Sequence, residues 1–286
     1  MQKKIEVFKT IETLRAGVKQ VKSKGLRLGL VPTMGFLHEG HLSLVELAQQ
    51  HSDQVFVSIF VNPAQFNDRG DLERYPVDIP KDIERLAERG VAAVFNPTPE
   101  MIYGPHFQSW VTVSELADTW EGADRPGHFK GVATVVSILF NLLQPDVAVF
   151  GEKDFQQLRI IERMVVDLKF GIDIVRGPLI REQDGLAMSS RNTFLTSEQR
   201  ATALAINQGL YRAREAFDKG EREAKRLVAL ALEQLEGEAH VKIHYMSVVD
   251  EEMLQEVDQA QDSGTRILAA VEVGGIRLID NISLVA

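Results

Sequence analysis

Cysteine is absent from the 286 residues, so the chain can form neither a disulfide bond nor a thiolate site. This absence fits a reducing compartment, and we expect a cytoplasmic protein. No apolar run approaches the roughly 20 residues that a membrane-spanning helix requires. The charged N-terminal stretch MQKKIEVFKTIETLRAG also lacks the apolar segment of a signal peptide. We therefore expect no membrane partner.

An excess of positive charge is lacking as well, because the formal net charge is −9. Binding to a nucleic-acid backbone needs clustered Lys and Arg, so we expect no nucleic-acid partner. Any phosphate ligand must bind in a local pocket where Lys, Arg, His and backbone N–H groups concentrate. The contents of hydrophobic (44%) and charged (26%) residues are ordinary for a globular protein with a real core. The length corresponds to one large or two modest domains.

Strand and helix patterns alternate through the first part of the chain. Short, nearly continuous apolar runs that end in Pro, Gly or Asn predict strands at 26–33, 54–61, 91–97, 146–153 and 172–180. Helical spacing of apolar residues predicts helices at 38–50, 79–88, 131–144 and 156–168. This alternation indicates right-handed βαβ units. We predict a doubly wound, Rossmann-like α/β domain with a parallel sheet over residues 1–183, with ligands outside the carboxyl ends of its strands.

The pattern changes after residue 183. Two helices are predicted at 197–220, with Ser197 as the candidate N-cap, and at 221–237. Strands follow at 241–250, 266–273 and 276–285, with Gly274–Gly275 as the hairpin turn between the last two. Helices followed by strands predict a smaller α+β domain over 184–286.

The stretch 31-VPTMGFLHEGHLSLVELAQQHS-52 leads from a predicted strand into a helix. The first turn of a helix has N–H groups without helical partners and the positive end of the dipole, and it attracts phosphate. Gly35 and Gly40 remove side chains that would hold a ligand away from the backbone. His38 and His41 are three residues apart and fall on one face of that turn. Phosphate binding is one interpretation; a helix capped by two surface histidines is the other, and metal ligation is a third.

Two further motifs offer cationic groups. Residues 151-GEKDFQQ-157 place Lys153, which suits phosphate, and Asp154, which suits a ribose hydroxyl, after a strand. Residues 184-DGLAMSSRN-192 combine hydroxyls, backbone N–H groups and a guanidinium in a possible anion cradle. The alternatives are a solvated turn for the first motif and a flexible connecting loop for the second.

Two other motifs offer mostly neutral or mixed groups. In 62-NPAQF-66, Asn62 and Gln65 could hold a polar, uncharged part of a substrate, although an ordinary Asn-Pro turn explains the same residues. In 124-DRPGHFKGV-132, Arg125, His128 and Lys130 lie close in sequence, although the segment also suits a polar loop before a helix.

Taken in order and spacing, these motifs resemble those of a known family. The His-x-Gly-His stretch and the Ser-Ser-Arg loop are similar to those of the nucleotidyltransferase superfamily. The full set consists of PTMGFLHEGHLSLV, SIFVNPAQF, RYP, RPGHFKGV, FGEKDFQQL and DGLAMSSRN. With this set the chain resembles the pantothenate synthetase (pantoate–β-alanine ligase) family from about residue 5 to 285.

The resemblance implies an ATP-dependent ligase that works with Mg²⁺ in two steps. Pantoate would attack the α-phosphorus of ATP to give pantoyl adenylate and pyrophosphate, and β-alanine would then displace AMP to give pantothenate. Residues 1–183 would bind ATP and pantoate, and 184–286 would act as a lid. The resemblance also implies a homodimer.

The resemblance assigns roles to individual residues. His38 and His41 would stabilise the leaving pyrophosphate, with His41 as the proton donor, and Lys153, Ser189, Ser190 and Arg191 would complete the catalytic set. ATP would contact Met34, Gly35, Phe36, Leu37, His38, Glu39, Gly40, His41, Gly151, Glu152, Lys153, Asp154, Ile180, Met188, Ser189, Ser190 and Arg191. The substrates pantoate and β-alanine would contact Gln65, Gln157, Asn62 and Arg125.

The chain departs from the family pattern at two places. Lys81 interrupts the acidic cluster that follows Tyr75–Pro76, where an Asp approaches Mg²⁺ in the family, and Asp82 is the remaining candidate ligand. The loop reads Met-Ser-Ser-Arg at 188–191 in place of the more frequent Leu-Ser-Ser-Arg, and this swap keeps apolar character and volume.

Three other functions compete with this interpretation. A nucleotidyltransferase with a phosphorylated acceptor would share the histidine motif, but it would need more cationic groups than the neutral Gln65 and Gln157. A nucleotide sensor on the same fold would bind ATP without forming product. A class I aminoacyl-tRNA synthetase would need an anticodon domain or a basic face, and the sequence shows neither.

Overall fold

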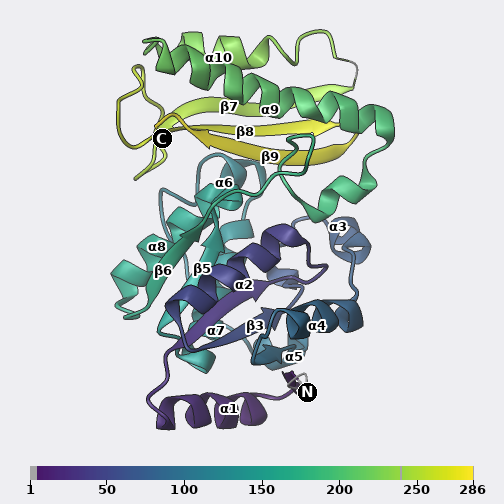
Figure 1. Cartoon of the computed structure of the whole chain (residues 1–286), viewed down its shortest axis with the longest axis vertical. Coiled ribbons are helices and arrows are strands. Elements are labelled where there is room, and N and C mark those ends of the chain that lie inside the picture. The colour runs from purple at the N-terminus through teal and green to yellow at the C-terminus, as the bar shows by residue number, and fades with distance from the viewer. Residues whose placement is uncertain (1–4, 239, 286) are drawn as a thin grey trace. The chain divides into compact units, whose positions relative to one another are not determined.

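A computed structural model describes residues 5–238 and 240–285, and the chain divides into two compact units (Figure 1). The first unit comprises Met1–Glu152 and Gln157–Pro178, and the second comprises Lys153–Gln156 and Leu179–Ala286. The predicted first domain ends at 183, whereas this unit ends at 178. The segment Lys153–Gln156 groups with the second unit because that unit holds it directly. Asn281 Nδ2 donates to the Lys153 carbonyl at 3.0 Å, and the Arg266 guanidinium lies 3.9 Å from the centre of the Phe155 ring.

The first unit contains a six-stranded sheet in which every pair is parallel, in the order β1-β4-β3-β2-β5-β6. Its strands are β1 (Glu6–Phe8), β2 (Leu28–Thr33), β3 (Gln54–Ile59), β4 (Ala93–Phe95), β5 (Val147–Gly151) and β6 (Asp173–Gly177). The strand order reverses between β2 and β5, and such a switch point is where open parallel sheets bind ligands. The predicted parallel sheet is therefore confirmed, and β1 is an addition to it.

Helices cover both faces of this sheet. They are α1 (Ile11–Ser23), α2 (Glu39–His51), α3 (Arg69–Arg74), α4 (Ile79–Glu88), α5 (Pro99–Ile102), α6 (Glu121–Asp124), α7 (His128–Leu143) and α8 (Phe155–Leu168), with short 3₁₀ turns η1 (Pro63–Gln65) and η2 (Glu152–Asp154). Val149 packs in one cluster with side chains of α2, whereas the neighbouring Phe150 contacts Phe140 of α7. Adjacent strand residues point to opposite faces, so α2 and α7 lie on opposite sides of a doubly wound sheet.

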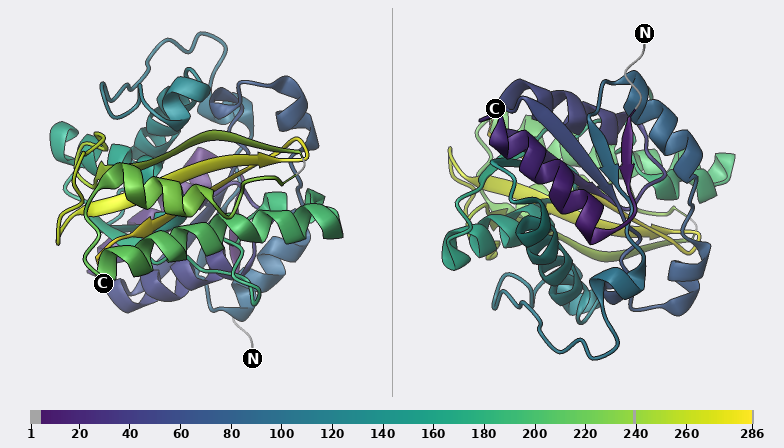
Figure 2. Two further views of the ribbon diagram at one scale, coloured as in Figure 1. Left: turned by 90° about the horizontal axis from the view of Figure 1, so that it is seen from above. Right: turned by 90° about the horizontal axis from the view of Figure 1, so that it is seen from below.

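The second unit is a smaller α+β fold, as predicted. A three-stranded antiparallel sheet is built from β7 (Val241–Asp250), β8 (Thr265–Val273) and β9 (Ile276–Ser283). The helices α9 (Ser197–Asp218) and α10 (Ala224–Leu232) cross one face of this sheet (Figure 2), and a 3₁₀ turn η3 (Ser190–Phe194) precedes them. Their shared apolar cluster includes Leu210, Leu227 and Ile267, all fully buried.

Two local predictions in this unit have different outcomes. Gly274 and Gly275 both have positive φ (56° and 85°) and join β8 to β9 in a two-residue hairpin, as predicted. The predicted N-cap Ser197 is wrong, because Ser197 is the first helical residue. Thr196 is the N-cap, and its hydroxyl accepts the backbone N–H of Gln199 at 3.2 Å while the Gln199 side chain accepts the N–H of Thr196.

Within the two described ranges, none of the helices combines the length and apolar character that crossing a membrane would need.

Candidate active site

The two histidines of the HEGH motif lie side by side where β2 leads into α2. His38 is the N-cap residue of α2, and His41 is at the third helical position. Their ring centres are 4.0 Å apart, which confirms the shared face predicted from their spacing. The backbone N–H of His38 donates to Nδ1 of His41 at 3.3 Å. A neutral His41 therefore carries its hydrogen on Nε2, as a donor on the other side of the ring.

The turn before α2 has a conformation that few residues adopt. Gly35 and Phe36 both have positive φ, 85° and 51°. A side chain at residue 35 would lie 2.9 Å from Ile59 Cγ2 and 3.1 Å from Asp82 Oδ2, so only glycine fits there. For a bulky residue such as Phe36 a positive φ is strained, and the strain must be offset by surrounding contacts. Gly40, the other predicted glycine, is the second residue of α2.

Asp82, on α4, supplies that offsetting contact. Its two carboxylate oxygens accept the backbone N–H groups of Phe36 at 2.7 Å and of Leu37 at 2.8 Å. The Asp82 side chain is buried, and burial raises the pKa of its carboxyl above the ordinary value, although the two N–H donors oppose that shift. Asp82 thus fastens the turn that presents the histidines.

The family resemblance implies Asp82 as a candidate magnesium ligand. In the part of the chain that the structure describes, there is no group of three or more His, Cys, Asp or Glu side chains that could hold a metal ion. Both oxygens of Asp82 are already engaged by backbone donors. This donor set does not fit a metal site that the protein builds by itself, and the role of Asp82 as a ligand stays a prediction.

A buried amide network lies at the end of β3. Asn62 donates from Nδ2 to Gln65 Oε1 at 2.9 Å and to the Gly131 carbonyl at 3.2 Å. Gln65 in turn donates from Nε2 to Met34 Sδ at 3.3 Å. Met34 belongs to the loop that leads to the histidines, so the NPAQF and HEGH motifs form one site within the first unit. The two motifs follow the neighbouring parallel strands β2 and β3, and this pairing brings them together.

The DRPGHFKGV motif holds the backbone of Gln65. His128 Nδ1 donates to the Gln65 carbonyl at 2.7 Å, and Arg125 Nη2 donates to the same oxygen at 3.3 Å. A side chain at Gly131 would lie 2.3 Å from the Ala64 carbonyl, so glycine allows α7 to approach η1 this closely. Lys130 does not join this group, because its ammonium lies 4.8 Å from the centre of the Trp110 ring.

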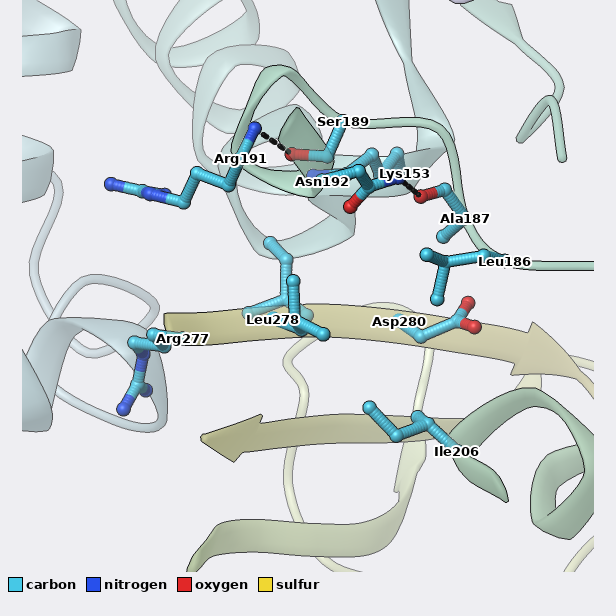
Figure 3. A pocket seen from close by; sticks show the side chains of 11 residues that line it. Lys153, Leu186, Ala187, Ser189, Arg191, Asn192, Ile206, Arg277, Leu278 and Asp280 are labelled. Atoms are coloured by element: carbon cyan, nitrogen blue, oxygen red, sulfur yellow. Dashed lines mark hydrogen bonds between the residues drawn. The ribbon is translucent and has the colours of Figure 1, made fainter. Parts of the chain in front are cut away.

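A pocket in the second unit brings together cationic residues that are far apart in sequence (Figure 3). Lys153, Ser189 and Arg191 line it. Ser189 Oγ accepts the backbone N–H of Arg191 at 3.2 Å, which starts η3, and Asn192 Nδ2 donates to the Ala187 carbonyl at 3.0 Å. Lys153 of the GEKD motif therefore shares one pocket with Ser189 and Arg191 of the MSSR motif, whereas Ser190 is not among the residues that line it.

The same pocket contains two charged residues that sequence analysis missed. In Figure 3 the guanidinium groups of Arg191 and Arg277 lie toward the same side, and the Asp280 carboxylate lies toward the other. Asp280 pairs with Arg181 through contacts of 2.7 and 2.9 Å. A signal for Asp280 was present in the sequence: it alternates with Leu278 and Ile282 on one buried face of β9, where period-two spacing calls for an apolar residue.

The remaining predicted residues have less distinctive surroundings. Gly151 ends β5, and Lys153 Nζ lies 3.6 Å from Asp154 Oδ1. The Ile180 carbonyl accepts the N–H of Met188 at 3.0 Å, so these two predicted ATP contacts are hydrogen-bonded to each other. Gln157 is half-buried, and among the described residues it makes no hydrogen bond to Gln65 or Asn62.

The family model of pantoate-beta-alanine ligase matches residues 6–283 of this chain. The chain belongs to the pantoate–β-alanine ligase family. It is 45% identical over 277 residues to the pantothenate synthetase of Syntrophotalea carbinolica, covering 97% of this chain and 98% of the relative. It is 46% identical over 276 residues to that of Aquifex aeolicus, covering 96% of this chain and 97% of the relative.

Solved structures agree with this membership. The pantothenate synthetase of Thermus thermophilus matches with a TM-score of 0.93 and 40% identity, over 99% of this chain and 100% of that one. The pantoate-beta-alanine ligase of Francisella tularensis, complexed with beta-gamma ATP and beta-alanine, matches with a TM-score of 0.81 and 33% identity, over 98% of each chain. The pantoate–β-alanine ligase family predicted from the motifs, and its fold, are confirmed.

Proposed function

We propose that this chain is an ATP-dependent ligase that condenses pantoate with β-alanine through pantoyl adenylate, giving pantothenate, AMP and pyrophosphate. The observation that carries the proposal is the contact between Gln65 Nε2 and Met34 Sδ. It joins a neutral amide network, suited to an uncharged hydroxyl-bearing acid, to the histidine turn, suited to phosphate. The family match over residues 6–283 supports the same reaction.

In the first step, a carboxylate oxygen of pantoate attacks the α-phosphorus of ATP, and the bond to pyrophosphate breaks. Negative charge builds on the departing phosphates. His41 Nε2–H points away from the His38 N–H that fixes the ring, and it donates to a phosphate oxygen there. His38 lies beside it and adds a second imidazole donor. Each such donor is worth on the order of 3 kcal/mol of transition-state stabilisation.

The other ATP contacts are assigned from the family resemblance. Met34–His41 line the adenosine and phosphates, while Gly151, Glu152 and Asp154 face the ribose. Lys153 faces the phosphates, and Ile180 contacts the adenine through its backbone. The loop residues Met188, Ser189, Ser190 and Arg191 close over the triphosphate. The pocket shared by Lys153, Ser189 and Arg191 supports this assignment.

Pantoate binds at Gln65, with Asn62, Gln157 and Arg125 as further members of the site. The contacts of Arg125 and His128 with the Gln65 carbonyl support this location, because they fix the backbone from which the Gln65 amide extends. In the second step the β-alanine amine attacks the acyl carbon of the adenylate, and AMP leaves. The mixed anhydride would hydrolyse in water, so we assign residues 184–192 to a lid that covers it.

Mg²⁺ enters this scheme with the phosphates of ATP. The ion typically takes one or two carboxylates and several waters together with substrate phosphates, and it would neutralise phosphate charge when bound. Among the described residues, no group of three or more His, Cys, Asp or Glu side chains could hold the ion, and Asp82 stays the predicted single carboxylate ligand. No step above therefore depends on a protein-held metal ion.

Two further properties belong to the proposal. A homodimer follows from the family resemblance alone. Light scattering of the purified chain measures the oligomeric state, and a monomer at all concentrations would contradict the homodimer.

A cytoplasmic location is consistent with the lack of cysteine, and cell fractionation tests this location.

The experiment that tests the function is an assay of AMP release with ATP, pantoate and β-alanine, in which each reactant is omitted in turn. AMP should form only when all three are present, while pyrophosphate exchange should need ATP and pantoate alone. Exchange stimulated by a phosphorylated acceptor would instead favour a nucleotidyltransferase. ATP binding without any product would favour a sensor.

A further inference from the structure

The donor and acceptor atoms of the Asn62 side chain are fixed by groups whose roles cannot be reversed. The backbone N–H of Ala64 can only donate, and it lies 3.2 Å from Asn62 Oδ1. The carbonyl of Gly131 can only accept, and it lies 3.2 Å from Asn62 Nδ2. The Asn62 amide therefore has one orientation, with its oxygen toward Ala64 and its nitrogen toward Gly131.

This orientation determines how the Gln65 amide is turned. Asn62 Nδ2 carries only hydrogens, so the atom of Gln65 that faces it at 2.9 Å must be the oxygen. The other end of the Gln65 amide is then the nitrogen, which extends toward Met34. Gln65 consequently presents N–H groups, and not a carbonyl, at the place where the acceptor acid binds.

Tyr103 completes the arrangement from a segment 41 residues away. Its hydroxyl lies 2.7 Å from Asn62 Oδ1 and must donate, because that oxygen has no hydrogen. Burial raises the pKa of Tyr103 to about 12, so the hydroxyl keeps its hydrogen near neutral pH. The ring is held between Phe60 and Trp110, with ring centres 6.4 and 6.1 Å away.

We infer that Tyr103 is a positioning residue for pantoate. Tyr103 acts through Asn62, so that Gln65 offers an N–H donor to an oxygen of pantoate. The inference rests on the proposed function, in which Gln65 binds pantoate. An N–H donor at this position suits a hydroxyl or carboxylate oxygen of pantoate.

The test measures pantoate-dependent exchange of pyrophosphate into ATP for Tyr103→Phe, Asn62→Asp and a control. Tyr103→Phe removes one hydrogen bond from Asn62, and the KM for pantoate should rise about 3- to 10-fold. The KM for ATP should stay within about twofold, since the hydroxyl of Tyr103 bonds to Asn62 and not to a residue assigned to ATP. Ser137→Ala is the control, because it removes another buried hydroxyl of the first unit, which contacts Met164 Sδ at 3.1 Å. Both KM values should stay unchanged in the control.

Asn62→Asp tests the direction of the amide. Aspartate has no N–H, so an oxygen would face the Gly131 carbonyl and Gln65 Oε1, and the Gln65 amide would turn its carbonyl toward the acid. We expect pantoate-dependent exchange to fall about 100-fold or more. If the Asp variant does not fold, as circular dichroism would show, the Tyr103→Phe comparison still decides.

The outcomes separate the inference from the function on which it rests. A wild-type chain without pantoate-dependent exchange would overturn the proposed function, and this inference with it. A wild-type chain that is active, with a Tyr103→Phe variant whose KM for pantoate is unchanged, would overturn the inference alone. Equal changes in the KM values for pantoate and ATP would show a general structural role for Tyr103 and would overturn it as well.

Discussion

Asp82 and Phe36 are 46 residues apart, and the carboxylate of the first accepts the backbone N–H of the second at 2.7 Å. This bond and its partner at Leu37 hold a turn with two consecutive positive φ values directly before the histidines. The strain of the turn persists because these contacts offset it. Asp82 thereby connects α4 to the turn that presents His38 and His41.

Asp82→Asn should therefore weaken both stability and catalysis. The new amide can accept only one of the two N–H groups and would turn its own N–H toward the other. We expect the free energy of unfolding to fall by about 2 kcal/mol, and the rate of pyrophosphate exchange to fall with it. Asp78→Asn is the control, because Asp78 caps the same helix from a partly exposed position and Asn caps equally well. Equal effects of the two variants in urea unfolding would contradict the prediction.

The pH dependence of stability gives a second test of Asp82. Burial raises the pKa of its carboxyl in the folded state above the ordinary value of 3.8. Between pH 3.8 and the raised pKa of the folded state, the folded state binds more protons than the unfolded state. The contribution of Asp82 to stability therefore falls as pH rises through this interval. The difference in unfolding free energy between wild type and Asp82→Asn should accordingly be largest below pH 3.8 and decrease upward. Urea titrations at several pH values measure it, and a difference that grows with pH would have the wrong sign.

His41→Ala should reduce turnover about 100-fold or more, because one preorganised donor to the departing phosphates is removed. The change should appear in kcat, while the free energy of unfolding changes little. His51→Ala is the matched control, since His51 is the exposed last residue of the same helix. A His38→Ala, His41→Ala double variant with intact turnover would contradict the role of the imidazole pair.

Local sequence signals account for most of the elements. Helix α4 has the predicted bounds, Ile79–Glu88, because Asp78 caps its start and Gly90 follows its end. The hairpin at Gly274–Gly275 likewise follows from two adjacent glycines with positive φ. The strand β1 is missing from the prediction because three residues carry too little periodicity to identify a strand.

The residues that hold the site in place could not be predicted from local sequence signals. The residue pairs Asp82–Phe36, Tyr103–Asn62 and Arg181–Asp280 are 46, 41 and 99 residues apart, and only the fold brings them together. Sequence motifs located the residues that we propose to face ligands, whereas the residues that support them carry no motif of their own. Asp82 illustrates the difference. Its position in the sequence suggested a metal ligand, whereas in the structure its carboxylate accepts the backbone N–H groups of Phe36 and Leu37.

The buried pair of Arg181 and Asp280 leads to a stability prediction in the second unit. Their side chains are only 16% and 4% exposed, and the contact is bidentate. Asp280→Asn would leave a buried guanidinium without its carboxylate, which costs about 3 kcal/mol or more. Glu233→Gln is the control, because its pair with Arg212 is nearly half exposed and such pairs contribute at most about 1 kcal/mol. Similar losses for the two variants in thermal unfolding would contradict the prediction.

Binding of ATP should order residues 184–192. Ser189 and Arg191 line the pocket with Lys153, and a triphosphate there would accept hydrogen bonds from the hydroxyls, the guanidinium and the backbone N–H groups of this loop. Amide hydrogen exchange in the loop should slow when ATP is added, because the open form of the loop becomes less populated. Strand β7 serves as the internal control, since its ladder with β8 is already formed and its exchange should not change. Identical exchange in the loop with and without ATP would mean that the loop does not close on the nucleotide.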